Sequence, residues 1–296
     1  MSEPDAGSLG QPAVGASLTA PATVAEAMNS ARAQGIERLD TQLLLCAVLD
    51  KPRSWLLAHD TDPLPLKAAT RFAELSARRA QGEPLAYLLG DKEFYGLSLR
   101  VAPGVLVPRA DTETLVDWAL DVLPAQTTPD RPTRVLDLGT GSGAIALAIR
   151  SRRPHVSVTA VDASPEALAI AADNARRLHL PLELLAGSWF EPLGTRRFDL
   201  IVSNPPYIAE GDPHLPALRF EPIQALTAGR DGLDDLRLIV RQARSHLKPG
   251  GWLLLEHGYD QADAVQALLR DAGFSAVSTR HDLAGQPRCT GGQWAV

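Results

Sequence analysis

The stretch Val135-Leu136-Asp137-Leu138-Gly139-Thr140-Gly141-Ser142-Gly143 decides the fold of this chain. Its first four residues, three of them apolar, predict a buried strand, and the alternate glycines predict a tight turn. The segment 144–152, rich in Ala, Ile and Leu, predicts a helix. A strand, a glycine turn and a helix in this order are typical of a parallel α/β sheet that binds a nucleotide-like ligand at the end of the strand.

The alternation of strands and helices continues to the end of the chain. After the strand at 135–138, further strands are expected at residues 157–161, 182–185, 199–202, 252–255, 275–280 and 293–296. Helices are expected to begin near 165 and to cover 233–247 and 261–272, with a turn at 248–251. Strands that alternate with helices predict a three-layer α/β sandwich whose sheet is mostly parallel.

A separate helical region precedes the sheet. Thr23-Val24-Ala25-Glu26 matches a capping box, and helices are expected to about residue 34, over 39–49, near 54–57 and over 65–80. We therefore expect residues 23–88 to form a small helical domain for partner recognition, followed by a β-hairpin and linker at 89–110 and the α/β domain at 111–296. Residues 1–22, rich in Gly, Ala, Ser and Pro, are expected to form a disordered tail.

The composition excludes several classes of protein. The 296 residues carry a net charge of -6, which argues against direct nucleic-acid binding through a general basic face. Cys46 and Cys289 have no metal-ligand spacing, so we expect no metal and two reduced cysteines, as in a cytoplasmic protein. No apolar run approaches the roughly 18 residues that span a bilayer, and the N-terminus lacks a signal-peptide pattern, so we expect no membrane partner.

The second informative segment is Phe198-Asp199-Leu200-Ile201-Val202-Ser203-Asn204-Pro205-Pro206-Tyr207. Two consecutive prolines end the predicted strand, because each has a fixed φ and lacks an N–H. The Asn204 side chain and the Pro205 carbonyl offer acceptors for both hydrogens of a planar NH2 group, whose face the Tyr207 ring can cover. The segment predicts a site for an amide or amino group, although in isolation an ordinary proline-rich turn fits it equally well.

The glycine turn and two carboxylates indicate which ligand the site takes. Gly139, Gly141 and Gly143 follow G-x-G-x-G rather than the G-x-G-x-x-G of dinucleotide sites, and the turn lacks the Lys of a phosphate loop. Asp137 would repel a pyrophosphate and suits a cationic ligand, whereas Asp162, at the next strand end, is placed to accept from ribose hydroxyls. S-adenosyl-L-methionine carries a sulfonium, an ammonium and no phosphate, so we expect it as the cofactor.

With these motifs the chain resembles the class I S-adenosylmethionine-dependent methyltransferases that act on planar nitrogens. The likeness rests on residues 135–147, Asp162 and Asn204-Pro205-Pro206-Tyr207. It narrows to the peptide-chain release factor glutamine methyltransferases through further segments, namely Val107-Pro108-Arg109 with Asp111-Thr112-Glu113, Phe220-Glu221-Pro222 with Ala225-Leu226, Asp231-Gly232-Leu233 and Asp282-Leu283-Ala284-Gly285. The resemblance covers residues 23 to 296 and implies a Rossmann-like class I methyltransferase sandwich plus the small helical domain.

The resemblance also implies an activity and a set of site residues. The expected reaction transfers a methyl group from S-adenosyl-L-methionine to N5 of the glutamine in the Gly-Gly-Gln motif of class 1 release factors. The implied cofactor-binding residues are Gly139, Thr140, Gly141, Ser142, Gly143, Asp162, Trp189 and Asn204. The implied substrate-binding residues are Asn204, Pro205, Pro206 and Tyr207, with catalytic roles for Asn204, Pro205 and Tyr207. Where the family often has an acidic residue near the adenine, this chain has Ser188.

Other acceptors would use the same amide-binding motif. A glutamine of a ribosomal protein is one alternative, and an exocyclic amine of adenine or guanine in nucleic acid is another. The net charge and the lack of a base-reading domain argue against nucleic acid, and the loop 109–113 with the helical domain favours a release factor. A non-catalytic binding module is disfavoured because Gly139, Asp162 and Asn204 are all present.

Two further features are expected to have structural roles only. His257 ends a predicted strand, where a histidine is more often a packing residue than a catalytic one. Gly291-Gly292-Gln293 repeats the expected target tripeptide within the chain itself, and we interpret the match as chance. We expect the methyl transfer to depend on positioning of the amide rather than on a general base.

Overall fold

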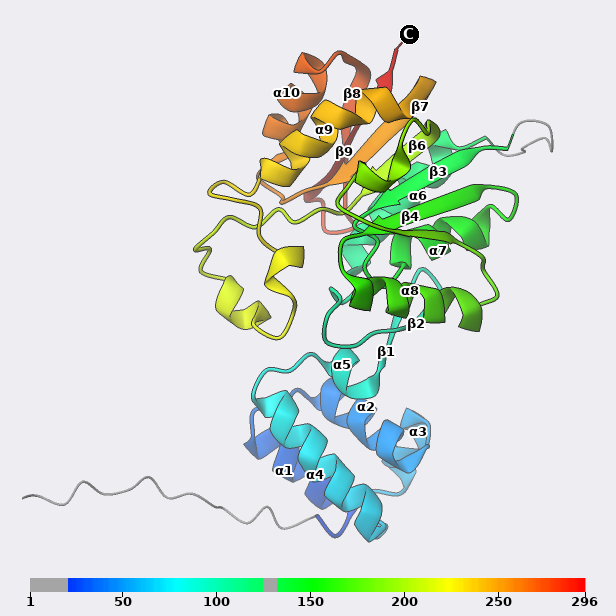
Figure 1. The fold of residues 1–296 in the computed structure, drawn as a ribbon. Coiled ribbons are helices and arrows are strands. Elements are labelled where there is room, and N and C mark those ends of the chain that lie inside the picture. Colours follow the sequence, from blue (N-terminus) through cyan, green and yellow to red (C-terminus); the bar gives the residue numbers. More distant parts are fainter. Residues whose placement is uncertain (1–20, 125–131, 296) are drawn as a thin grey trace, which may run out of the picture. The chain divides into compact units, whose positions relative to one another are not determined.

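The computed structural model describes residues 21–124 and 132–295, so most of the expected tail at 1–22 lies outside the described residues (Figure 1). The chain divides into two compact units between Gln81 and Gly82. Each unit is described below by itself. No helix in the described ranges combines the length and apolar character needed to cross a membrane.

The first unit is a group of helices. Its elements are α1 (Val24–Ala33), α2 (Arg38–Leu49), α3 (Arg53–Ala58) and α4 (Leu66–Ala80). The predicted start of α1 is confirmed, because the Thr23 hydroxyl accepts a hydrogen bond from the Glu26 N–H at 3.2 Å. The Glu26 carboxylate reaches back to the N–H of Ala22 at 2.8 Å, one residue before the position that a capping box predicts.

The second unit opens with a short helix and a hairpin. Helix α5 (Leu85–Leu89) lies at the end of the segment 23–88 that was expected to be helical. Strands β1 (Asp91–Phe94) and β2 (Leu97–Arg100) pair in antiparallel fashion, and Tyr95 and Gly96 between them have positive φ angles of 52° and 79°. A two-residue hairpin turn of type I′ requires a positive φ at both of its central residues. The 3-10 helix η1 (Ala110–Thr112) leads into α6 (Glu113–Val122).

A seven-stranded sheet forms the centre of this unit. Its strands are β3 (Arg134–Leu138), β4 (Ser157–Asp162), β5 (Glu183–Ala186), β6 (Phe198–Ser203), β7 (Leu247–Glu256), β8 (Phe274–His281) and β9 (Pro287–Trp294). The strand order is β5-β4-β3-β6-β7-β9-β8; β9 pairs in antiparallel fashion with β7 and β8, and the other four pairs are parallel. The predicted mostly parallel sheet is therefore confirmed.

Helices cover both faces of the sheet, as the predicted three-layer sandwich requires (Figure 1). One core joins the sheet to α6, α7 (Ala144–Arg152) and α8 (Pro165–Arg177), and it contains Val135 and Val202. The other core joins the opposite face to α9 (Asp234–His246) and α10 (Ala262–Asp271), and it contains Leu136 and Ile201. Successive strand residues enter opposite cores, which explains the continuous apolar runs in the sequence.

The carboxyl-terminal strands are longer than predicted. Strand β7 begins at Leu247 and includes the expected turn at 248–251, where its pairing with β6 shifts register. Strand β9 begins at Pro287 and contains both glycines of the Gly291-Gly292-Gln293 tripeptide. A Cβ at Gly291 would lie 2.4 Å from Leu254 Cδ2, and a Cβ at Gly292 would lie 2.9 Å from Phe274 Cβ. These glycines therefore serve close packing within the sheet.

The order of the strands places the predicted motifs at one edge. Strand β3 lies between β4 and β6, so successive crossovers leave it in opposite directions. Ligands of open α/β sheets bind at such a switch point, outside the carboxyl ends of the strands. The glycine turn follows β3, Asp162 ends β4, and Asn204 follows β6.

Candidate active site

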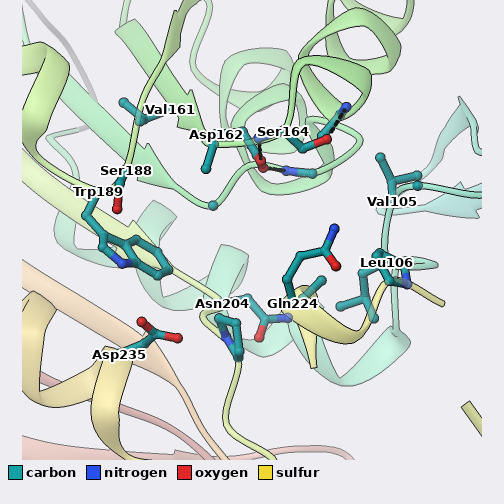
Figure 2. A pocket seen from close by; sticks show the side chains of 18 of the residues that line it. Val105, Leu106, Val161, Asp162, Ser164, Ser188, Trp189, Asn204, Gln224 and Asp235 are labelled. Atoms are coloured by element: carbon teal, nitrogen blue, oxygen red, sulfur yellow. Dashed lines mark hydrogen bonds between the residues drawn. The ribbon is translucent and has the colours of Figure 1, made fainter. Parts of the chain in front are cut away.

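A cavity of about 260 Å³ opens at the carboxyl ends of β3, β4 and β6 (Figure 2). The predicted site residues that line it are Gly139, Gly141, Asp162, Trp189, Asn204 and Pro206. Asp162 and Asp235 are acidic, and no lysine, arginine or histidine of the described chain is among the lining residues. An acidic cavity without basic groups suits a cationic ligand and disfavours a phosphate.

Asp162 holds the backbone around the cavity with both of its carboxylate oxygens. Oδ2 accepts the Gly141 N–H at 2.8 Å, and Oδ1 accepts the Ser164 N–H at 2.9 Å (Figure 2). Each carboxylate oxygen has a second acceptor position, so these bonds leave capacity for two hydroxyl donors. The carboxylate thus fixes the glycine turn and remains able to bind a diol.

Trp189 forms one wall of the cavity from a strained backbone position. Its φ of +47° is rare for a bulky residue. A Cβ at Gly139, which itself has a φ of +71°, would lie 3.4 Å from the indole ring. The glycine therefore supplies the backbone conformation of the turn, while a Cβ there would meet the ring only at ordinary contact distance.

Two lining residues were missed by the sequence analysis. Asp235 in the first turn of α9 accepts a hydrogen bond from the Trp189 side chain, and burial raises the pKa of its carboxyl. Gln224 reaches the same cavity from the 3-10 helix η4 (Ile223–Ala225), which follows Pro222 (Figure 2). Both lie outside any motif, so only the folded arrangement brings them to the site. Asp235 adds a second carboxylate to the cavity that Ser188 also lines.

Asp137, Thr140, Ser142 and Gly143, which lie in or next to the glycine turn, do not line the cavity. Asp137, which the sequence analysis interpreted as suited to a cationic ligand, is completely buried and accepts the Thr140 hydroxyl at 2.6 Å. Burial raises the pKa of this carboxyl to about 7. The Ser142 carbonyl accepts the Asn174 side-chain amide at 2.9 Å, and a Cβ at Gly143 would meet Leu147 at 3.2 Å. These residues therefore stabilise the conformation of the glycine turn by hydrogen bonds and packing on the side away from the cavity.

A second cavity, of about 510 Å³, adjoins Asn204 on its other side. Asn204 and Tyr207 line it together with Arg109 and Asp111. Asn204 lines both cavities, whereas Pro205 is buried and lines neither. Asn204 is thus the polar side chain that the two cavities share.

Tyr207 is held from three directions. Its hydroxyl donates to Glu256 Oε1 at 3.3 Å, and its carbonyl accepts the Gln261 side chain at 3.0 Å. A Cβ at Gly232 would lie 2.2 Å from this carbonyl, so no other residue fits there. The ring is consequently a rigid part of the site rather than a mobile cover.

The loop before α6 is tied to a distant segment. Buried Glu221 accepts the Val107 N–H at 3.0 Å and forms an ion pair with Arg109. Asp111 pairs with Arg288 at 3.2 Å, and Glu113 accepts the Tyr95 N–H at 2.9 Å. The charged residues of this loop are therefore anchored and do not form a freely solvated helix start.

His257 has the structural role that the sequence predicted. It is fully buried, with Nε2 2.7 Å from the Thr290 hydroxyl and Nδ1 2.8 Å from the Gly258 carbonyl. Burial lowers the pKa of the imidazole. No group of three or more acidic, histidine or cysteine side chains able to hold a metal occurs in the described part of the chain.

Known proteins resemble this chain over most of its length. Residues 23–90 match the family model described as PrmC N-terminal domain, and residues 112–219 match the model described as methyltransferase small domain. A Bordetella pertussis protein named release factor glutamine methyltransferase is 51% identical over 261 residues, 87% of this chain and 95% of the relative.

Two further relatives support the same comparison. A Pseudomonas aeruginosa protein of that name is 54% identical over 261 residues, 87% of this chain and 93% of the relative. The crystal structure of a methyltransferase from Pyrococcus furiosus superposes with a TM-score of 0.52 at 19% identity. That match covers 76% of this chain and 100% of the other, and at this identity it establishes a shared fold alone.

Proposed function

This chain belongs to the family of release factor glutamine methyltransferases, and from that membership we propose that it methylates a glutamine of peptide-chain release factors. The reaction transfers a methyl group from S-adenosyl-L-methionine to the side-chain nitrogen N5 of the glutamine in the Gly-Gly-Gln motif. The observation that carries this proposal is the position of Asn204, which lines both the acidic cavity and the adjoining one.

The acidic cavity fits S-adenosyl-L-methionine. The cofactor bears a net positive charge, and the ionisable residues that line the cavity are the two carboxylates of Asp162 and Asp235. Asp162 has acceptor capacity for the ribose hydroxyls, and the Trp189 ring with Asp235 beside it forms a wall suited to the adenine. When bound, the cofactor supplies an electrophilic methyl group on a positively charged sulfur.

The chain's own part is to hold and orient the glutamine amide. Amide nitrogen is a weak nucleophile because its lone pair is delocalised into the carbonyl. We assign the Asn204 side-chain oxygen and the Pro205 carbonyl to the two amide hydrogens, Pro206 to the rigid backbone between them, and the Tyr207 ring to one face of the amide. Positioning of this kind contributes up to roughly 7–11 kcal/mol when the geometry is ideal.

The partner and its place in the cell follow from the same proposal. We assign recognition of the release factor to the loop that carries Arg109, which lines the second cavity, and to the helical segment 23–88. Cys46 and Cys289 are both free thiols, in agreement with a reducing compartment. We therefore place the enzyme in the cytoplasm.

Mass spectrometry of a purified class 1 release factor tests the proposal. Incubation with the enzyme and S-adenosyl-L-methionine should add one methyl group to the glutamine of the Gly-Gly-Gln tripeptide. A release factor with that glutamine replaced by alanine is the matched control and should gain none. A ribosomal-protein preparation and single-stranded DNA and RNA, tested in parallel, should remain unmodified, and methylation of these instead of the release factor would refute the assignment.

A further inference from the structure

The two cavities have a wall in common as well as Asn204. Besides Asn204, the residues that line both cavities are Leu106 and Ala225. Leu106 belongs to the segment 104–111, which follows β2, and Ala225 belongs to the segment 218–226 in the connection between β6 and α9. Two segments that are more than 100 residues apart in the sequence therefore form one shared wall.

Each of the two segments continues from this wall into both cavities. On the acidic cavity, the first segment contributes Val105 and the second contributes Gln224, on the side opposite Trp189 (Figure 2). On the second cavity, the first segment contributes Arg109 and the second contributes Leu218. A displacement of one segment relative to the other would therefore change the shape of both cavities.

The side chain of Glu221 joins the two segments. It extends from the second segment, is only 3% exposed, and accepts the Val107 N–H at Oε2 with a distance of 3.0 Å. Its other oxygen, Oε1, pairs with the Arg109 guanidinium. In the described part of the chain the Val107 N–H has no other acceptor. Both carboxylate oxygens of Glu221 are thus bonded to the first segment.

A buried carboxylate at this position acts mainly on geometry. Apolar contact between the segments exists without it, because Phe220 packs against the cluster that contains Val105 and Val107. Burial of a carboxylate costs free energy, and the ion pair and hydrogen bond that compensate this cost contribute little net stability. They do favour one relative position of the segments, because hydrogen bonds depend steeply on distance and angle.

We propose that Glu221 is a positioning residue that holds the segment 218–226 against the segment 104–111 and so sets the shape of both cavities. The inference rests on the proposed function, because that function assigns S-adenosyl-L-methionine to the acidic cavity and the release factor to the second one. Glu221 itself lines neither cavity. Its effect on both ligands passes through the wall that they share.

The residues assigned to the substrate amide are held by other contacts. The Tyr207 hydroxyl donates to Glu256 at 3.3 Å. Asn204 Nδ2 donates to the Thr112 hydroxyl at 3.3 Å. Loss of Glu221 should therefore weaken the binding of cofactor and release factor together, and should leave the rate of the fully bound complex nearly unchanged.

Calorimetric titration and steady-state kinetics of full-length variants test the inference, with a class 1 release factor as substrate. Glu221→Ala leaves the buried Val107 N–H without an acceptor, so it should raise both the cofactor Kd and the KM for release factor about tenfold. Its kcat at saturation should stay within about threefold of wild type. Glu221→Gln keeps an oxygen for the Val107 N–H and loses only the ion pair with partly exposed Arg109, so both constants should rise only about threefold.

The split between binding and turnover separates positioning from a merely structural role. A substitution that only destabilises the fold lowers the fraction of active enzyme, and hence the apparent kcat, while the folded molecules keep the wild-type Kd. Glu183→Ala is the matched control, because Glu183 also pairs with an arginine, Arg196, at 2.7 Å and accepts the Thr159 hydroxyl at 2.8 Å. Glu183 begins β5 and lines neither cavity, so this variant should keep the wild-type Kd, KM and kcat.

The outcomes distinguish this inference from the proposed function. A wild-type enzyme that binds cofactor but leaves the release factor unmethylated would contradict the proposed function itself. A wild-type enzyme that methylates the release factor, together with a folded Glu221→Ala variant of unchanged Kd and KM, would refute only the role of Glu221. A change in only one of the two constants would refute the shared wall. Circular dichroism shows whether each variant is folded, and if Glu221→Ala is not, unchanged constants in Glu221→Gln would refute the inference.

Discussion

Gly139 and Trp189 lie side by side in the lining of the cofactor cavity, where a Cβ on the glycine would be 3.4 Å from the indole ring. This arrangement joins the turn after β3 to the segment after β5, which are about 50 residues apart in the sequence. Both residues line the cavity at the position that we assign to the adenine. A change at either residue should therefore affect cofactor binding before it affects chemistry.

Gly139→Ala should weaken cofactor binding about five- to tenfold. The φ of +71° costs a non-glycine residue about 1 kcal/mol or more, and relief of this strain would move the turn that lines the cofactor cavity. Gly35→Ala is the control, because Gly35 has a φ of +78° and no atom within 4 Å of an added Cβ. Calorimetric titration should show unchanged cofactor affinity for the control, and equal affinity in both variants would contradict this account.

Asn204→Ala should lower kcat by about 100-fold or more, a loss typical of removing one oriented polar contact to the reacting group. The cofactor Kd should change far less, since Asn204 is one of many residues lining that cavity. The measurement uses radiolabelled cofactor and purified release factor. Turnover within threefold of wild type would refute the assignment of Asn204 to the substrate amide.

Asp235→Asn should raise the cofactor Kd about tenfold. The change preserves shape but removes a negative charge that faces the cavity and accepts from Trp189. Asp234→Asn is the neighbouring control, because Asp234 is exposed and pairs with Arg237 at 3.0 Å. Equal effects of the two substitutions on affinity would indicate a general charge effect rather than a contact in the site.

Asp137→Asn should change how the free energy of unfolding depends on pH. Burial raises the pKa of Asp137 from 3.8 to about 7, so the folded state keeps a proton that the unfolded state releases between these values. The stability contributed by this carboxyl is fully present below pH 4 and is lost as the pH rises to 7. The amide does not titrate, so the variant should gain about 3 kcal/mol relative to wild type over this interval.

Urea unfolding at pH 4.5 and pH 8 measures this difference. A packing cost of the amide is the same at both pH values and cancels from the comparison. A difference between variant and wild type that does not change with pH would show that the Asp137 carboxyl is already ionised in the folded protein at pH 4.5.

The local sequence predicted most of the helices and strands of the fold. The apolar runs, the Thr23 and Ser164 caps and the glycine turn correspond to elements whose observed limits are mostly within one or two residues of the expected ones. The exceptions are places where packing overrides local preference. The Lys248–Gly251 segment is extended as part of β7, and β9 contains glycines because neighbouring side chains leave no room for a Cβ.

Site residues could be predicted from the sequence only where they occur in short motifs. Asp162 and Asn204 follow strands, and a parallel sheet brings such positions to one edge, so their proximity follows from sequence order alone. Asp137 belongs to the same motif, yet its side chain turns into the protein and binds Thr140. A pattern of residues does not specify which way a strand-end side chain points.

The sequence by itself determined the α/β architecture and the pairing of a glycine turn with an Asn-Pro-Pro-Tyr segment, because both depend on contacts between residues close along the chain. Only the tertiary structure decided that Asp235 and Gln224 join this site and that Thr112 bonds to Asn204. These residues come from separate parts of the chain, and their burial and charge depend on which segments pack against them. Such long-range packing is a property of the folded chain and leaves no local pattern in the sequence.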